Sequence, residues 1–190
     1  MFRVVASFVL LLILSASVRA ENVDFPRFPA LSPDGSRVVF SWRGDLWLAP
    51  GDGGAAQRLT AHPADELRSA WSPDGARIVF ESNRDGVRNL WVMAPDGTGV
   101  RQLTSLDGAA TLASVGRDAR GATIVTFDAN RENDLYRSPR PYRIPIDGGT
   151  IDRVIDAFGT RTNFSPDGTR VLFDRGGASW SRRGYRGPDA

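Results

Sequence analysis

The residue types that most often carry chemistry are scarce in this chain. Among 190 residues there is one histidine and no cysteine, and all 24 positively charged residues are arginine. A Ser-His-Asp site would have to use His62, which lies in the segment Leu59–Pro63. No Gly-x-Ser-x-Gly turn is present to hold a nucleophilic serine. We therefore predict that His62 is a loop residue between two repeats and that the chain has no catalytic residue.

Metal and cofactor sites are also disfavoured. One histidine without cysteine cannot make a multi-histidine or thiolate zinc site, and without lysine there is no phosphate-binding Gly-x-x-x-x-Gly-Lys loop. The segments Asn83–Gly86 and Asn130–Asp134 are rich in oxygen ligands suited to Ca²⁺. Each supplies too few oxygens and has an arginine in its middle, so a hairpin turn is the favoured interpretation. The sequence predicts no metal site and no cofactor.

A nine-residue sequence motif recurs along the chain and sets where all these residues lie in the predicted fold. It occurs at Ser32–Phe40, Ser72–Phe80 and Ser165–Phe173, and a degenerate copy spans 115–127. The first two copies are 40 residues apart, and Phe127 lies 47 residues after Phe80 and 46 before Phe173. A period of about 40–47 residues with short apolar runs is typical of β-propeller blades.

Each repeat predicts four short strands. Ser-Pro-Asp-Gly is a turn, because proline presets φ, aspartate binds nearby backbone and glycine accepts positive φ. The flanking runs are short and rich in β-branched and aromatic residues, which favours strands over helices. A Leu-Trp strand, a second glycine-rich turn and a closing Arg-x-Leu-Thr strand follow. The expected third and fourth strands are 45–48 and 57–60, then 89–92 and 101–104, then 134–137 and 152–155.

We predict an all-β fold, a β-propeller of four-stranded antiparallel blades that is incomplete. Three full blades span about 25–61, 62–105 and 106–156, and part of a fourth spans 157–190. Propellers close with about four to eight blades, so the chain is expected to be the N-terminal part of a longer protein. The alternative is a small open array that a partner or self-association completes.

The aromatic residue of each third strand is expected to pack between blades rather than to bind a ligand. These residues are Trp47, Trp91 and Tyr136. The first two lie five residues before the aspartate of the next turn, whereas Tyr136 lies eleven before Asp147. The six additional residues include two prolines, which cannot donate to a β-ladder. They predict a protruding loop after the third strand of blade three, a place where binding often occurs.

The first 20 residues are typical of a secretory signal peptide. Arg3 precedes the apolar run Val4–Leu14, and Val18–Ala20 has small residues at a cleavage site. An uncleaved anchor is the alternative. Residues 21–190 contain 22 arginines and 22 acidic residues, which excludes a basic nucleic-acid footprint. We expect an exported protein, periplasmic or extracellular, that does not bind the membrane after cleavage.

The repeats resemble the WD40-like propeller repeat of TolB, which also occurs in tricorn-type peptidases, prolyl-oligopeptidase relatives and some amidohydrolases. The segments 44–47, 58–63 and 176–187 are most similar to the tricorn branch. That resemblance implies the non-catalytic propeller of a serine peptidase, which gates peptide substrates or binds proteins through a propeller face. The peptidase residues of that family lie in a C-terminal region that this sequence does not contain, so none is assigned here. A TolB-like protein-binding module and the propeller of another hydrolase are the alternatives.

The signal peptide leads to a first prediction, cleavage after Ala20. The N-terminal sequence of the exported protein should begin at Glu21, because peptidases cut after small residues that follow an apolar run. Edman degradation or mass spectrometry of the purified protein tests this, and a membrane-bound form that retains Met1 would contradict it.

Overall fold

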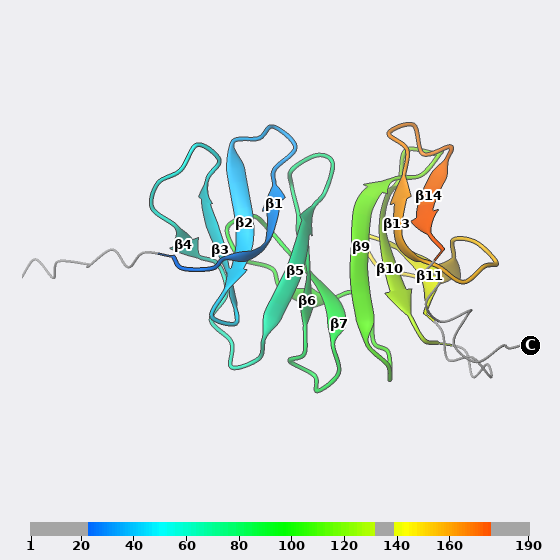
Figure 1. The fold of residues 1–190 in the computed structure, drawn as a ribbon, viewed down its shortest axis with the longest axis horizontal. Coiled ribbons are helices and arrows are strands. Elements are labelled where there is room, and N and C mark those ends of the chain that lie inside the picture. Colours follow the sequence, from blue (N-terminus) through cyan, green and yellow to red (C-terminus); the bar gives the residue numbers. More distant parts are fainter. Residues whose placement is uncertain (1–22, 132–138, 176–190) are drawn as a thin grey trace, which may run out of the picture.

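The computed structural model describes residues 23–131 and 139–175, and every regular element in those residues is a β-strand (Figure 1). The predicted signal peptide and the segment 176–187 lie outside the described residues. The strands form three four-stranded sheets and one two-stranded sheet, all antiparallel and ordered as in the sequence. The all-β propeller fold predicted from the repeats is confirmed, and the sheets do not close into a ring.

The strand bounds follow the repeat. The first sheet is β1 (Arg27–Leu31), β2 (Arg37–Trp42), β3 (Asp45–Pro50) and β4 (Gln57–Arg58). The second is β5 (Glu66–Trp71), β6 (Ile78–Ser82), β7 (Asn89–Met93) and β8 (Arg101–Gln102). The third is β9 (Ala110–Arg117), β10 (Thr123–Ala129), β11 (Arg140–Pro145) and β12 (Asp152–Arg153). The last is β13 (Thr160–Phe164) and β14 (Val171–Asp174).

The turn between the first and second strands forms as its sequence predicts. Gly35 donates its N–H to the Ser32 carbonyl at 2.9 Å and adopts a φ of 71°. The Asp34 carboxylate accepts the N–H of Ser36 at 3.1 Å. In the degenerate copy, Gly121 makes the same backbone bond to Asp118 at 2.8 Å. The turn geometry therefore survives where its sequence does not.

The Leu-Thr pair that closes the repeat follows the fourth strand in each of the first two sheets and is not part of that strand. The fourth strand has two residues in each sheet, which is shorter than predicted, although the N–H groups of Leu59 and Leu103 still donate to the carbonyls of Leu46 and Leu90 at 2.8 Å. The hydroxyl of Thr60 instead accepts the N–H of Leu46 at 2.9 Å, and Thr104 does the same for Leu90. The threonine side chain thus satisfies a third-strand donor that the short fourth strand leaves unpaired.

The predicted position of the third strand in the third sheet is wrong. It was expected at 134–137, but β11 lies at Arg140–Pro145, and Tyr136 lies outside the described residues. Tyr142 is paired with Phe127, as Trp47 is with Phe40. The additional residues therefore precede the third strand. Proline did not exclude a strand, because Pro141 contributes its carbonyl, which accepts the N–H of Val154 at 2.9 Å.

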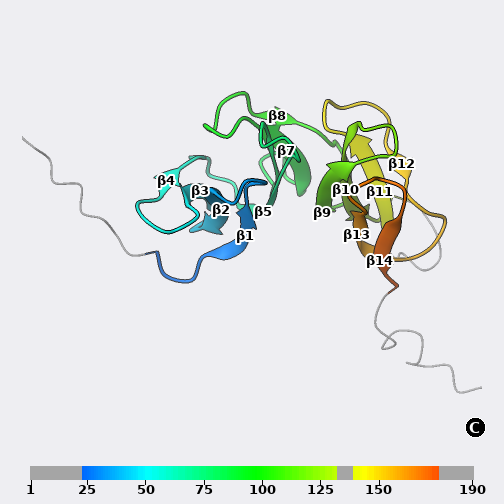
Figure 2. The same ribbon diagram turned by 90° about the horizontal axis from the view of Figure 1, so that it is seen from above.

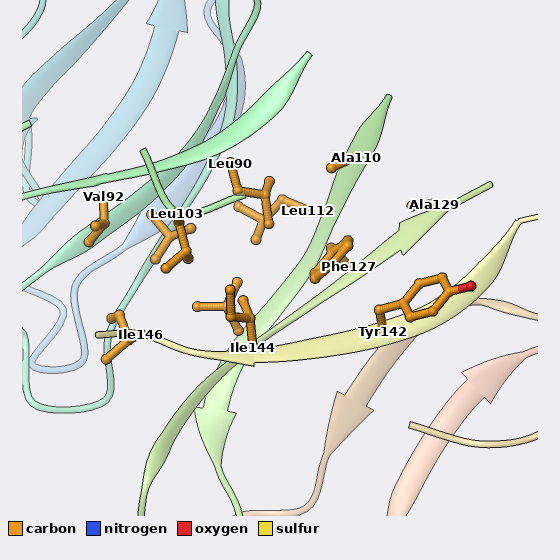
Figure 3. Packing of buried hydrophobic residues seen from close by; sticks show 12 residues of the cluster. Leu90, Val92, Leu103, Ala110, Leu112, Phe127, Ala129, Tyr142, Ile144 and Ile146 are labelled. Carbon is orange, nitrogen blue, oxygen red and sulfur yellow. The ribbon is translucent and has the colours of Figure 1, made fainter. Parts of the chain in front are cut away.

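The hydrophobic core lies between successive sheets, and we call each such contact a seam. Val39 and Leu46 of the first sheet cluster with Trp71, Ile78 and Phe80 of the second. A larger cluster joins the second and third sheets, where Leu90 and Val92 approach side chains such as Leu112 and Ile144 (Figure 3). Seen from above, the sheets fan out with their first strands on the inside (Figure 2). Each sheet thus buries its faces only against its neighbours.

Truncating an apolar side chain in a seam should lower the free energy of unfolding far more than truncating an apolar side chain at the surface. Phe80 is fully buried in the first seam, so Phe80→Ala should lower the free energy of unfolding by about 3–5 kcal/mol. Val100→Ala, at a residue that is 37% exposed, should change it by less than about 0.5 kcal/mol. Urea denaturation measures both, and equal effects would contradict the seam as the core.

Candidate functional site

The first strands of the last three sheets, together with the end of β10, line a cleft of about 490 Å³, which we call the inner cleft. Three consecutive sheets contribute to it. Its principal lining residues are Arg68 of β5, Thr111 and Leu112 of β9, Asp128 of β10, and Thr160 and Arg161 of β13. Asn130 and Pro139, on either side of the long connection between β10 and β11, lie at the same cleft.

Asp128 is the most perturbed acidic group at the inner cleft. Its side chain is 7% exposed, and its Oδ2 accepts the N–H of Arg161 at 2.9 Å. Its Oδ1 is buried and has no hydrogen-bond partner among the described residues. Burial raises the pKa of this carboxyl from 3.8 to about 6, although the Arg161 N–H and the charges of Arg161 and Arg68 oppose the shift. Asp128 can therefore gain or lose a proton near neutral pH.

Arg68 is held at the cleft by a second buried acid. The Glu81 carboxylate is fully buried, and its Oε1 accepts the N–H of Leu112 at 2.8 Å. Arg68 and Arg88 each lie 3.6 Å from one of its oxygens. Burial raises the pKa of Glu81, against these bonds and charges. The Arg68 guanidinium also lies 4.6 Å from the centre of the Phe28 ring, which further orients it.

Glu81 and Asp128 occupy one position of the repeat, directly after the second-strand phenylalanine. Ser41 holds that position in the first sheet. Its hydroxyl donates to the carbonyl of Glu66 at 2.6 Å, in the first strand of the next sheet. In all three seams a polar side chain at this position therefore binds the backbone of the following first strand. We call these three bonds the seam bonds.

Arg84 is the arginine in the middle of Asn83–Gly86, the loop that was considered for Ca²⁺, and its contacts show why an arginine lies there. Its guanidinium donates to Glu66 at 2.6 Å and lies 4.6 Å from the centre of the Trp91 ring. Glu66 is fully buried and also accepts a hydrogen bond from Thr60 of the first sheet. Burial raises the pKa of Glu66. The loop thus supports a seam, and the described residues contain no group of three or more potential acidic, histidine or cysteine ligands.

The remaining candidate residues do not reach the inner cleft. His62 is exposed, and its Nδ1 accepts the N–H of Ala64 in the same loop, at 3.1 Å. Trp47 packs edge-on against Trp42, with ring centres 5.2 Å apart. Tyr142, the aromatic of β11, is 2% exposed and stacks on Phe127. These two contacts lie within single sheets, whereas Trp91 packs against the cluster that joins the first and second sheets, as predicted for packing between blades. Tyr136, the third residue of that prediction, lies outside the described residues.

Comparison with known proteins identifies the family. The model of the tricorn protease N-terminal beta propeller domain matches residues 24–190. The chain belongs to this family. Tricorn protease homolog 1 of Streptomyces coelicolor is 32% identical over 127 residues, which cover 65% of this chain and 11% of that protein. The Tol-Pal system protein TolB of Anaeromyxobacter sp. (strain K) is 38% identical over 81 residues, 40% of this chain and 18% of that protein.

A solved structure supports the same fold for this tricorn-type propeller. The putative TolB from Agrobacterium tumefaciens superposes with a TM-score of 0.65 and 25% identity, covering 81% of this chain and 60% of that one. The chain thus spans less than two thirds of each of these three proteins. Among residues 23–131 and 139–175 there is no helix long and apolar enough to cross a membrane.

Asp128→Asn should change how the stability of this propeller depends on pH. With a pKa near 6 when folded and 3.8 when unfolded, Asp128 binds more protons in the folded state between those values. Its stabilising contribution is therefore complete below about pH 4 and is lost as the pH rises through 6. Relative to the wild type, the variant should gain up to about 3 kcal/mol of unfolding free energy between pH 4 and pH 7.

Urea denaturation across this pH range measures the effect, and Asp34→Asn is the control. Hydrogen bonds from Ser32 and Ser36 lower the pKa of the exposed Asp34 to about 2. The stabilisation from Asp34 is present above about pH 4 and is lost as the pH falls through 2. Its variant should therefore differ from the wild type by a constant amount between pH 4 and pH 7. A constant difference for Asp128→Asn as well would contradict a buried, proton-binding Asp128.

Proposed function

We propose that the chain is the non-catalytic propeller portion of an exported, tricorn-like serine peptidase, and that it gates or holds peptide substrates. The family match over residues 24–190 is the observation that carries this proposal. The similarity to a much longer tricorn protease homolog supports it, because the chain spans 11% of that protein. In this proposal the peptide bond is cleaved elsewhere in the parent protein.

The chemistry of the inner cleft fits an extended peptide. Arg68 and Arg161 supply guanidinium donors for carbonyl and carboxylate oxygens, and the Arg161 side chain is 82% exposed. Asp128, Asn130 and Thr111 add acceptors and further donors beside them. The carboxylates near the two arginines limit its net positive charge, so the cleft suits a polar backbone better than a polyanion.

Export is the second part of the proposal. It is supported by Arg3, the apolar run Val4–Leu14 and the small residues before Glu21. The chain is free of cysteine, so its fold does not depend on the redox state of the compartment. A periplasmic or extracellular location follows from these sequence features.

A TolB-like protein-binding module is a second candidate function. The superposition on the putative TolB from Agrobacterium tumefaciens and the local identity to the Anaeromyxobacter TolB favour it. In that case the ligand is a folded protein that covers a propeller face, and an isolated extended peptide would not bind.

Peptide binding without cleavage tests the first candidate. The purified chain should retain members of a random peptide library, and mass spectrometry should find every peptide intact. Arg161→Ala should weaken retention about tenfold, because a charge-assisted hydrogen bond to the peptide is lost. Val100→Ala, a residue remote from the cleft lining, is the matched control and should bind like the wild type.

Two outcomes would overturn this proposal. Absence of peptide binding, together with capture of a folded envelope protein, would favour the TolB-like function. Peptide turnover that His62→Ala abolishes would show that the chain is itself catalytic.

A further inference from the structure

The third seam, between the third sheet and the pair β13 and β14, has a polar side chain where the first two seams have an apolar one. Thr126 of β10 directly precedes the repeated phenylalanine of its sheet, as Val39 and Val79 do in theirs. All three side chains are fully buried. Each valine belongs to a hydrophobic cluster that joins its sheet to the next one. Thr126 thus places a hydroxyl where the other two sheets bury only carbon.

The residues paired with Thr126 on both neighbouring strands are polar as well. Ser114 of β9 is paired with Thr126, whereas an alanine is paired with the corresponding valine in each of the first two sheets. On the other side Thr126 is paired with Arg143 of β11, and the corresponding residues of the first two sheets are Leu48 and Val92. Paired residues of adjacent strands lie on the same face of a sheet. Three neighbouring positions on one face of the third sheet are therefore polar, and all three are apolar in the sheets before it.

Hydrogen bonds take the place of apolar packing on this face. The hydroxyls of Ser114 and Thr126 each lie 2.8 Å from the carbonyl oxygen of Thr162 in β13, and 2.7 Å from each other. Two hydroxyls carry only two hydrogens for these three contacts, so one contact at a time lacks its hydrogen. The residue before Thr162 makes the third seam bond, in which Asp128 accepts the N–H of Arg161 at 2.9 Å.

Polar contacts of this kind resist separation in water less than apolar contacts do. When hydroxyl and carbonyl groups part, water binds to each of them, so the net loss per hydrogen bond is small. When the valines of the first two seams part from their neighbours, apolar surface is exposed to water and nothing compensates for it. The three seams therefore differ in what holds them closed.

The third seam also divides the inner cleft. Thr111 and Asp128 line the cleft from the third sheet, whereas Thr160 and Arg161 line it from β13. Figure 1 shows β13 beside β9 and β10, the strands that carry the first two of these residues. Movement of β13 away from β9 and β10 separates the two sides of the cleft.

We propose that the third seam is the place at which this row of sheets opens, and that its opening parts the two sides of the inner cleft. The first two seams stay closed at the same time, because alanine and valine occupy the positions of Ser114 and Thr126 there. Opening of this kind requires no particular ligand in the cleft, so it is independent of peptide binding.

Hydrogen exchange at two matched amides measures the opening of individual seams. The N–H of Arg161 is bonded to Asp128 across the third seam, and the N–H of Leu112 is bonded to Glu81 across the second. Each rate, measured by NMR on the whole chain, is corrected for the rate of the same amide in an unfolded peptide. The Arg161 amide should then exchange at least about 100-fold faster than the Leu112 amide, because it is freed whenever the third seam opens.

An apolar replacement tests the cause of this difference. The double variant Ser114→Ala, Thr126→Val gives the third sheet the alanine and valine of the first two sheets. It should slow exchange at Arg161 about tenfold or more and leave Leu112 unchanged. Val79→Thr is the converse change in the second seam and should accelerate exchange at Leu112. Equal exchange at the two amides of the wild type, or no slowing at Arg161 in the double variant, would overturn the proposal.

Discussion

The seam bonds are the interaction on which the rest of the structure depends. The second sheet carries buried apolar residues on both faces, Val79 and Leu90 on one and Ile78 and Phe80 on the other, and can bury them only against the sheets beside it. The polar side chain after the second-strand phenylalanine fixes how the next sheet docks, because it binds the backbone of the following first strand. Every first strand carries a register shift, which takes residues out of the ladder and makes their backbone groups available.

Burying carboxylates in these seams is costly, and arginine chemistry offsets the cost. Glu66 and Glu81 are fully buried and sit beside guanidinium groups. The planar guanidinium of Arg84 can bind Glu66 with its edge while its face lies over Trp91. A lysine ammonium would provide the charge without that planar stacking surface. This geometry gives a physical reason for arginine at that position.

Much of the fold could be predicted from the sequence, because the repeat encodes it locally. The Ser-Pro-Asp-Gly turns and the strands beside them depend on residues a few positions apart. The third strand of the third sheet was placed wrongly, because Asp134–Arg137 resembles the Asp-Leu-Trp of the first repeat and Tyr136 was taken as the repeated aromatic instead of Tyr142. The spacing of five residues from Tyr142 to Asp147 matches that from Trp47 to Asp52 and was the signal that the prediction missed.

The inner cleft was missed for a different reason. Asp128 and Arg161 are 33 residues apart and meet only because the fourth repeat packs on the third. The sequence signal was an acidic residue directly after the repeated phenylalanine, which occurs at Glu81, Asp128 and Asp174. Asp128 both closes a seam and lines the cleft. Burial and the Arg161 N–H act in opposite directions on the pKa of this carboxyl. The contact that docks the fourth repeat on the third therefore also affects the charge of the cleft lining.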